Sequence, residues 1–495
     1  MTKHRYIIRA ALIAAILLMY FADTTRANEP IWPQFRGPNS SGLAAEGQNP
    51  PVKFGPKQNV LWKTSVPSGH SSPCIWGDHI FLTGYTKEKK ELQVFCIERS
   101  SGNIRWRKIV PAEKIEKVHS ISSPATATPA TDGERVYVYF GSFGLLCYDF
   151  AGKQQWAVPL PIPKTRFGSG TSPIVAGELV ILNRDEQKEP YLLAVDRKSG
   201  ETVWKQSRQR TMATYSTPVL WAGQLVIHRR RGLVAHDAAD GARIWSVSAT
   251  TSGTSTPVIG NNVLFVGTWD NFGEPDQRVK QPDFKALVEQ YDKNGDMQIS
   301  ESEFPEDLAL SRRPEAGNIE GAQLYLKQYF QGFDRNKDGL LDETVWKRMV
   351  ASSLRPKKDH GLMAIKLGGK DDVTSTHILW QEKRSVPEIP SPLYYDGRVY
   401  MIKNGGIVSC MDADSGKLLY RERLGAAGPY FSSPIAANGR IYIASGKGTI
   451  TVFAAGDTLQ VLARNNLKES IFATPAVVEN KLYVRTVKHM YAFGE

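Results

Sequence analysis

A Ser-Pro or Thr-Pro dipeptide recurs along most of the chain, and this repeat constrains the fold more than any other feature of the sequence. The prolines of the dipeptides are Pro73, Pro129, Pro173, Pro218, Pro257, Pro392, Pro434 and Pro475. Intervals of 56, 44, 45, 39, 135, 42 and 41 residues separate them. The chain therefore contains eight similar units, and the long interval indicates an insertion of roughly 90 residues in one of them.

Each unit has the pattern of four short β-strands. A short apolar run follows the proline, and a turn such as Asp132-Gly133 or Asn438-Gly439 comes next. Two further strand-like runs and a glycine turn follow, and in most units the last run contains a tryptophan. Four short strands in every roughly 40–50 residues are typical of a β-propeller, because each blade is one four-stranded sheet. We therefore predict an all-β fold: an eight-bladed β-propeller over residues 59–274 and 357–495, with a small α-helical insertion at 275–356.

The turn between the third and fourth runs has the sharpest pattern. In one copy Ala194, a small residue, is followed two positions later by Asp196, and Gly200 precedes Trp204. The carboxylate is placed to accept hydrogen bonds from turn amides, and glycine tolerates the positive φ of such a turn. The tryptophan offers a large apolar area that can cover a seam between blades. Four other copies end at Trp106, Trp156, Trp245 and Tyr420.

These turns, repeated at a fixed spacing, resemble the blade motif of PQQ-like, quinoprotein-type β-propellers. The resemblance extends over most of residues 59–495 outside the insertion. It implies the propeller fold. It implies no single activity, since similar propellers serve as quinone-dependent dehydrogenases and as non-enzymatic scaffolds such as the outer-membrane assembly lipoprotein BamB.

The two ends of the repeat are incomplete in complementary ways. Met490–Phe493 is a third strand with no fourth strand after it, and Val60–Thr64, which contains Trp62, is a fourth strand before the first dipeptide. We expect the N-terminal strand to complete the last blade, because this closes the ring and removes free sheet edges.

The first 27 residues have the pattern of a secretory signal peptide. Lys3, Arg5 and Arg9 precede an apolar stretch, Ala10–Ala22, and Thr25-Arg26-Ala27 supplies small residues before a cut after residue 27. The stretch is shorter than the roughly 20 residues that cross a bilayer, although an uncleaved anchor is the alternative. We therefore expect a periplasmic or secreted protein that approaches a membrane only through this segment. Residues 28–58 form an N-terminal extension, in which Trp32–Asn39 is predicted to lie as a strap across the ring.

The chain is mildly basic. Its net charge is +12, and about +9 remains without the signal peptide, which carries four basic residues and one acidic residue. The densest cluster, Arg229-Arg230-Arg231, is explained by a hairpin turn on a solvated rim; a site for anionic polymers is the alternative. Nucleic acid is not an expected partner, because no nucleic-acid-binding motif accompanies the charge.

The insertion contains two segments that resemble 12-residue EF-hand loops, 292–303 and 334–345, next to helical patterns at 284–291, 324–330 and 345–350. The resemblance implies Ca²⁺ ligation by oxygens at alternate loop positions. In the first loop these are the side chains of Asp292, Asn294, Asp296, Ser300 and Glu303, with the carbonyl of Gln298. Met297 stands where the family has glycine and must adopt a positive φ, at a cost of roughly 1 kcal/mol. Pro305 crowds the start of the exit helix.

The second loop has the opposite strengths. Gly339 holds the turn position, but Val345 stands where the family has its bidentate glutamate. The oxygens available there belong to Asp334, Asn336, Asp338, the carbonyl of Leu340, and Asp342. We therefore expect Ca²⁺ in the first loop and weak or no binding in the second, with the metal acting structurally. A vestigial pair that binds no metal is the alternative.

No arrangement of residues predicts catalysis. The nearest cluster of aromatic and oxygen groups is Trp269-Asp270-Asn271 with Glu274, which a loop that leads into the insertion explains equally well. His70 and His119 each precede a dipeptide and are candidates to face the central channel. Cys96, Cys147 and Cys410 occupy the small-residue slot of the repeat, which predicts buried strand residues, and a Cys74–Cys96 pair stays open.

We therefore predict a monomeric, non-enzymatic scaffold or binding protein, with a protein or glycan partner on a face of the propeller. PQQ is not an expected cofactor, because the alcohol-oxidising members pack a Cys-Cys pair against it and the sequence has none. A PQQ-dependent periplasmic dehydrogenase and a calcium-responsive binding module are the alternatives.

Overall fold

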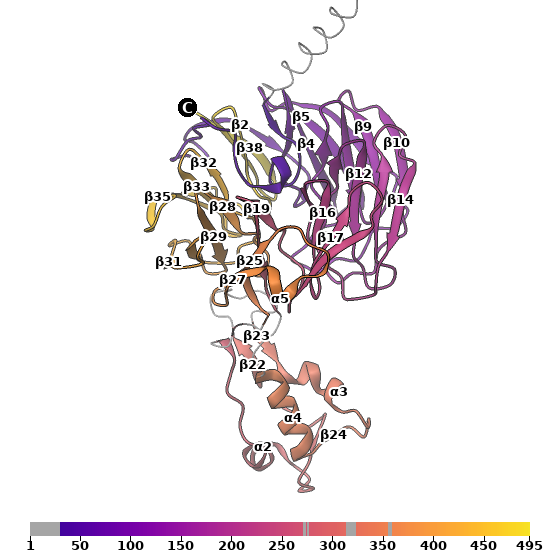
Figure 1. Ribbon diagram of the computed structural model, residues 1–495, viewed down its shortest axis with the longest axis vertical. Helices are drawn as coiled ribbons and strands as arrows, with labels where there is room; N and C mark the ends of the chain where they lie inside the picture. The colour runs from indigo at the N-terminus through magenta and orange to yellow at the C-terminus, as the bar shows by residue number, and fades with distance from the viewer. Residues whose placement is uncertain (1–29, 271–273, 275–276, 313–322, 355–358) are drawn as a thin grey trace, which may run out of the picture.

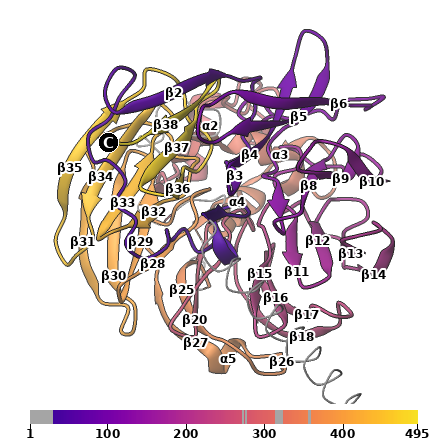
Figure 2. The ribbon, with the colours of Figure 1, turned by 90° about the horizontal axis from the view of Figure 1, so that it is seen from above.

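The computed structural model describes residues 30–270, 274, 277–312, 323–354 and 359–495. Eight sheets are arranged around a central axis, and together they form the predicted eight-bladed propeller (Figures 1 and 2). In blade 1 the strands from the axis outward are β3 (Cys74–Trp76), β4 (His79–Thr86), β5 (Glu91–Glu98) and β6 (Ile104–Val110). The expected signal peptide, residues 1–27, lies outside the described residues.

The other blades repeat this order. Blade 2 consists of β7 (Ala130–Thr131), β8 (Arg135–Phe140), β9 (Gly144–Asp149) and β10 (Gln154–Pro159). Blade 3 consists of β11 (Ile174–Ala176), β12 (Leu179–Arg184), β13 (Tyr191–Asp196) and β14 (Thr202–Ser207). Blade 4 consists of β15 (Val219–Trp221), β16 (Gln224–Arg229), β17 (Gly232–Asp237) and β18 (Arg243–Ser248). Blade 5 consists of β19 (Val258–Gly260), β20 (Val263–Thr268), β25 (Gly361–Lys366) and β27 (Ile378–Glu382). Blade 6 consists of β28 (Leu393–Tyr395), β29 (Arg398–Lys403), β30 (Ile407–Asp412) and β31 (Leu418–Arg423). Blade 7 consists of β32 (Ile435–Ala437), β33 (Arg440–Ala444), β34 (Thr449–Ala454) and β35 (Gln460–Asn466).

Blade 8 closes the ring with strands from both ends of the chain. Its inner strands are β36 (Ala476–Val478), β37 (Lys481–Arg485) and β38 (His489–Phe493), and its outermost strand is β2 (Val60–Ser65). In the antiparallel β2–β38 pair, Trp62 lies opposite Ala492 and Lys63 lies opposite Tyr491. The predicted closure by the two chain ends is therefore confirmed.

The Ser/Thr-Pro repeat has a structural cause in a closed ring of hydrogen bonds. In every blade the backbone N–H of the residue before the proline donates to the hydroxyl of its counterpart in the next blade, at 2.9–3.2 Å. The last bond of the circle runs from Thr474 N to Ser72 Oγ, at 3.0 Å. The eight members are Ser72, Thr128, Ser172, Thr217, Thr256, Ser391, Ser433 and Thr474.

In five blades a tryptophan of the outermost strand packs on the turn of the next blade. Trp106 packs on Gly152, whose φ is 82°, and its Nε1 donates to the carbonyl of Phe150 at 2.8 Å. Trp62, Trp156, Trp204 and Trp380 pack in the same way on Gly102, Gly200, Gly241 and Gly416.

Trp245 of blade 4 does not pack on such a glycine. Its Nε1 donates to Gln224 Oε1 of its own blade at 2.8 Å. At that seam β26 (Asp371–Asp372) and α5 (Thr374–His377) lie beside β18 in place of an ordinary turn.

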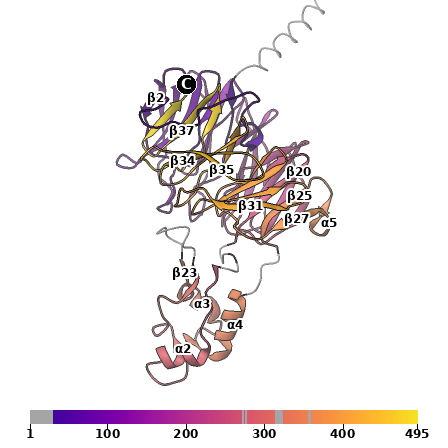
Figure 3. The same cartoon turned by 90° about the vertical axis from the view of Figure 1, so that its left-hand side faces the viewer.

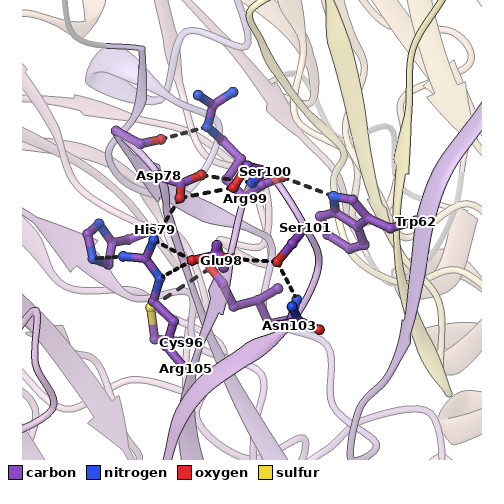
Figure 4. A network of polar contacts seen from close by, with 12 residues as sticks. Trp62, Asp78, His79, Cys96, Glu98, Arg99, Ser100, Ser101, Asn103 and Arg105 are labelled. Carbon is purple, nitrogen blue, oxygen red and sulfur yellow. Dashed lines mark hydrogen bonds and ion pairs between the residues drawn. The ribbon is translucent and has the colours of Figure 1, made fainter.

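Figure 4 shows the seam between blades 8 and 1. Trp62 Nε1 donates to the carbonyl of Arg99 at 2.9 Å, and Arg105 joins Asp78 and Glu98 with contacts of 2.6 and 2.8 Å. Arg99 also pairs with Glu479 of blade 8 at 2.7 Å. The ion pair of Arg99 and the hydrogen bond of Trp62 thus join blade 1 to blade 8 across this seam.

The N-terminal extension crosses one end of the ring as the predicted strap. Its strand β1 (Ile31–Trp32) adds to the inner edge of blade 1, and η1 (Pro38–Ser40) follows. Asn39 donates to the Leu220 carbonyl of blade 4, and Arg36 donates to the Pro392 carbonyl beside blade 6. Figure 2 looks down on this end of the ring, with the helical insertion on the far side.

The insertion leaves blade 5 between β20 and β25 and forms a lobe that projects from the ring (Figures 1 and 3). Its elements are α2 (Phe284–Tyr291), β21 (Ile299–Ser300), β22 (Ala309–Arg312), β23 (Gln323–Tyr325), η4 (Leu326–Tyr329), α3 (Phe330–Phe333), β24 (Leu340–Leu341) and α4 (Glu343–Leu354). A separate apolar core, which includes Leu287, Phe330 and Trp346, supports it.

One predicted helical segment of the insertion is helical only in part. Residues 324–330 begin in strand β23, which pairs with β22, and continue as a 3-10 turn before α3. Pairing with β22 outweighs the helical pattern at Leu324 and Tyr325. No helix among the described residues is long and apolar enough to cross a membrane.

Candidate functional site: the central cavity

A cavity of about 390 Å³ occupies the axis of the propeller. All eight hydroxyl residues of the hydrogen-bonded ring line it, and Phe35 of the strap closes one end. Towards the opposite end the wall consists of the loops that connect the blades, and Leu324, Gln328 and Tyr329 of the insertion lie at the mouth. The cavity therefore lies between the strap and the helical lobe.

A second layer of the wall follows from the register of the repeat. The residue three positions before each proline also lines the cavity, two residues before the hydroxyl. This layer consists of His70, Thr126, Gly170, Tyr215, Thr254, Ile389, Phe431 and Phe472. The hydroxyl layer is uniform, whereas this layer varies from blade to blade, so it is where one member of the fold can differ from another.

Five aromatic rings of the wall pack against one another, three of them in one stack and two in a separate tilted pair. Phe472 lies between His70 and Phe431, with ring centroids 4.2 and 4.8 Å apart, and His119 lies 4.9 Å from Phe167. Burial, reinforced by Arg485, lowers the pKa of His70 to about 3, so this ring is neutral at physiological pH. Both histidines thus line the cavity, as the sequence indicated.

The charges of the described lining are mostly basic. Arg166 lies over the Phe167 ring at 5.3 Å, and Arg230 lies on the same side of the cavity. Glu388 is the carboxylate among the described lining residues. An acid–base reaction that needs two carboxylates has no such pair in this part of the wall.

The Trp269–Glu274 cluster is not assembled into a cofactor site within the described residues. Trp269 lines the cavity, whereas Glu274 accepts from Val386 N at 2.7 Å and pairs with Lys403 at 3.3 Å, which ties the start of the insertion to the propeller. Asn271 lies outside the described residues. Asp270 is buried but is not part of the described lining.

The described lining does not fit PQQ of the kind used by alcohol-oxidising members of the fold. All four cysteines are free and buried in the blades, so none lies against the cavity and the Cys74–Cys96 disulfide is absent. Burial raises the pKa of Cys96 to about 12, which makes its thiol unreactive.

The first acidic loop of the lobe, Asp292–Glu303, is closed by its own carboxylates. Asp292 accepts from Gly295 N and Met297 N at 2.8 and 2.9 Å. Glu303 accepts from Lys293 N and Ser300 N, each at 3.0 Å. The Ser300 hydroxyl, followed by backbone donors, lowers the pKa of Glu303 to about 2, so this side chain is a carboxylate at neutral pH.

Met297 adopts the positive φ that its position requires, 62°, and its side chain is exposed. The residues after Glu303 form a bend and a turn in place of a helix, and Pro305 lies among them.

The second acidic loop, 334–345, uses an acid as a helix cap. Asp342 Oδ1 accepts from Val345 N at 2.7 Å at the start of α4, and Val345 packs against the lobe core. Asp334 accepts from Gly339 N at 3.0 Å. The two loops lie side by side through the β21–β24 pair, in which Ile299 faces Leu341. Among the described residues, no three His, Cys, Asp or Glu side chains form a metal-binding cluster, so any cation there also needs amide and carbonyl oxygens.

Comparisons with known proteins agree with this architecture. The profile of a family described as outer membrane protein assembly factor BamB matches residues 52–188, 112–296 and 344–492. A comparison with curated protein sequences found no match.

Among solved structures, BamB from Moraxella catarrhalis is similar at 13% identity and a TM-score of 0.52, over 88% of this chain and 98% of that one. A europium-containing methanol dehydrogenase is similar at 10% identity and 0.54, over 94% and 98%. The quinohemoprotein alcohol dehydrogenase from Comamonas testosteroni is similar at 12% identity and 0.52, over 94% and 81%. Identities this low show the fold alone, because similar folds carry different functions.

Proposed function

Because the chain belongs to the family of outer membrane protein assembly factor BamB, a family of PQQ-like β-propellers, we propose that it is a non-enzymatic binding protein of the periplasm or cell exterior. One observation carries the proposal. The described lining of the central cavity offers hydroxyls, stacked rings and basic groups, with Glu388 as its carboxylate, which suits binding better than acid–base catalysis. A protein or glycan partner would contact the face that holds the cavity mouth.

A dehydrogenase assay tests this function against the alternative of a PQQ-dependent enzyme. The purified mature chain is incubated with PQQ and Ca²⁺, and reduction of an artificial electron acceptor is followed with alcohols and sugars. No turnover above a protein-free control is expected, because the described cavity lacks the thiol pair and the paired acids. Sustained turnover would overturn the proposal.

We also propose that the lobe is an EF-hand pair that holds one structural Ca²⁺ in the first loop. The support is the orientation of Asp292, Asn294 and Asp296, which accept hydrogen bonds from loop amides, and Glu303, which closes the loop. In the second loop Asp342 caps a helix and Val345 supplies no oxygen. One working loop favours a structural metal over a calcium-responsive switch.

Calorimetric Ca²⁺ titration tests the metal site. We expect one site in the native chain and its loss in Glu303→Gln, because the substitution removes the only acid that closes the first loop. Glu301→Gln is the matched control, since this exposed acid lies two residues away and contacts Gln331 instead. Equal titrations for the native chain and Glu303→Gln would contradict the assignment.

A further inference from the structure

We propose that the face around the cavity mouth binds an acidic polysaccharide, such as a uronate chain, whose terminal sugar acid enters the central cavity. This inference rests on the binding function proposed above and names the class of its ligand. Three features carry it: a ring of hydroxyl donors, a basic rim around the mouth, and a cavity of the size of a sugar residue with its neighbour.

The first feature is the orientation of the hydroxyl ring. Each of the eight hydroxyls accepts one backbone N–H bond from the preceding blade, and within the described residues none of them donates to another protein group. All eight side chains line the cavity and each residue is at most 2% exposed. A hydroxyl that already accepts one bond has its proton left to donate. The wall therefore presents a circle of donors and suits a ligand rich in acceptor oxygens, such as a carboxylate or a sugar ring.

The second feature is a basic rim. Loops that connect consecutive blades emerge at the same end of the ring as the mouth, and those before blades 2, 3 and 4 carry the exposed residues Lys114, Lys117, Lys164, Arg166 and Arg210. Arg230 lines the cavity beside them. Glu113 is the exposed acid of these three loops.

The arginine cluster at the β16–β17 turn divides its roles. Arg229 forms an ion pair with the buried Asp185 at 3.0 Å, and Arg208 pairs with the same carboxylate at 2.8 Å. Arg230 lies in the cavity wall and Arg231 is exposed. Two of the three arginines thus add to the field at the mouth.

The opposite end of the ring carries acids. The repeated carboxylates, among them Asp149, Asp196, Asp237 and Asp412, lie in the turns between third and fourth strands, away from the mouth. The same turns also carry Lys153, Lys198 and Lys417, so the attraction of a polyanion to the mouth rests on the basic rim described above.

The cavity favours a polysaccharide over a nucleic acid. A volume of about 390 Å³ admits a small group and excludes a duplex. Recognition of single-stranded bases uses free aromatic faces as stacking platforms. Here both faces of Phe472 are already covered, by His70 and Phe431. The wall combines aromatic rings with a circle of hydroxyl donors, which matches the mixed character of a pyranose.

Binding of defined oligomers tests the proposal. Trigalacturonate, neutral maltotriose and a single-stranded DNA oligomer are titrated into the full mature chain by calorimetry at low and high salt. Trigalacturonate is expected to bind, with an affinity that falls with salt, and maltotriose to bind roughly tenfold more weakly or less. Equal binding of maltotriose, or binding of DNA but not trigalacturonate, would overturn the proposal.

Two sets of variants locate the site. Arg166→Gln combined with Arg230→Gln is expected to weaken trigalacturonate binding roughly tenfold or more. Lys53→Gln combined with Lys57→Gln removes the same charge from exposed residues of the N-terminal extension and should leave binding unchanged. In the ring, Thr256→Val removes one donor and Thr256→Ser keeps it, so only the valine variant should weaken binding. Equal effects of the two double variants would contradict the proposal even if Thr256→Val failed to fold. Loss of sugar binding with normal Ca²⁺ titration and no dehydrogenase turnover would sink this inference alone.

Discussion

At the scale of single residues, the repeat motif shapes a turn within each unit and supplies a tryptophan that contacts the next blade. The acid and the glycine behave as the sequence predicts: Asp196 accepts from Lys198 N and Ser199 N at 2.9 and 2.7 Å, and Gly200 has a φ of 76°. The partner of the tryptophan could not be predicted from the sequence. Gly200 contacts Trp156 of the preceding blade and not Trp204 of its own blade. A contact between units about 44 residues apart leaves no mark within either unit. Apart from His70, the second layer of the cavity wall was missed for a similar reason, although its signal, the position three residues before each proline, is present in the sequence.

Trp204→Ala is expected to destabilise the propeller by about 3–5 kcal/mol. The side chain is buried, packs on Gly241 and donates to the Ala238 carbonyl at 3.2 Å, so the change leaves a cavity at a blade seam. Chemical denaturation measures the loss. Its neighbour Val203 is half exposed, and Val203→Ala should change stability by less than about 1 kcal/mol. Similar losses for both variants would show that the seam contributes little.

At the scale of elements, local signals decided which segments were predicted correctly. Helix 284–291 has the predicted bounds because Asp283 caps it, accepting from Ala286 N at 2.8 Å, and one apolar face packs into the lobe core. In segment 324–330 the prediction is wrong for Leu324 and Tyr325, because β22 supplies a strand partner that the local pattern does not reveal. The turns between third and fourth strands were predicted best, since each one satisfies its own amides.

These turns make stability sensitive to acid. Backbone donation from Ser199 lowers the pKa of Asp196 in the folded chain, and Ser415 lowers that of Asp412. A depressed folded pKa adds stability above the unfolded value, near 3.9 for aspartate, and the contribution disappears as pH falls through the folded value. We therefore expect the unfolding free energy to fall below about pH 4. Asp196→Asn should lose part of that acid dependence while its stability at pH 7 drops; an unchanged pH profile would contradict this origin.

At the scale of the whole molecule, closure of the ring brings all eight blades around one central cavity. The number of blades and the closing strand could be predicted from the sequence. The chain has an extra fourth strand at its N-terminal end and lacks one at its C-terminal end, so the N-terminal strand can complete the last blade. It gave no hint that the strap and the lobe lie at opposite ends of the channel, since that depends on which end of blade 5 carries the insertion in three dimensions. The cavity forms only in the assembled molecule. All eight units line its wall, and the strap and the lobe, which lie at its two ends, are not part of any repeat.

Removal of residues 1–65 should therefore harm the molecule far more than removal of residues 1–29. The longer deletion takes away β2 and the strap, so β38 becomes an unpaired edge and blade 8 keeps three strands. Exposed edges promote pairing between chains, so we expect a lower midpoint of thermal unfolding and concentration-dependent aggregation, measured by scanning calorimetry and light scattering. The shorter deletion leaves every described pair of the propeller in place and should unfold like the mature chain. If the longer deletion stayed monomeric with an unchanged midpoint, closure by the N-terminal strand would not be what holds the eight blades together, because the remaining seams would then suffice without it.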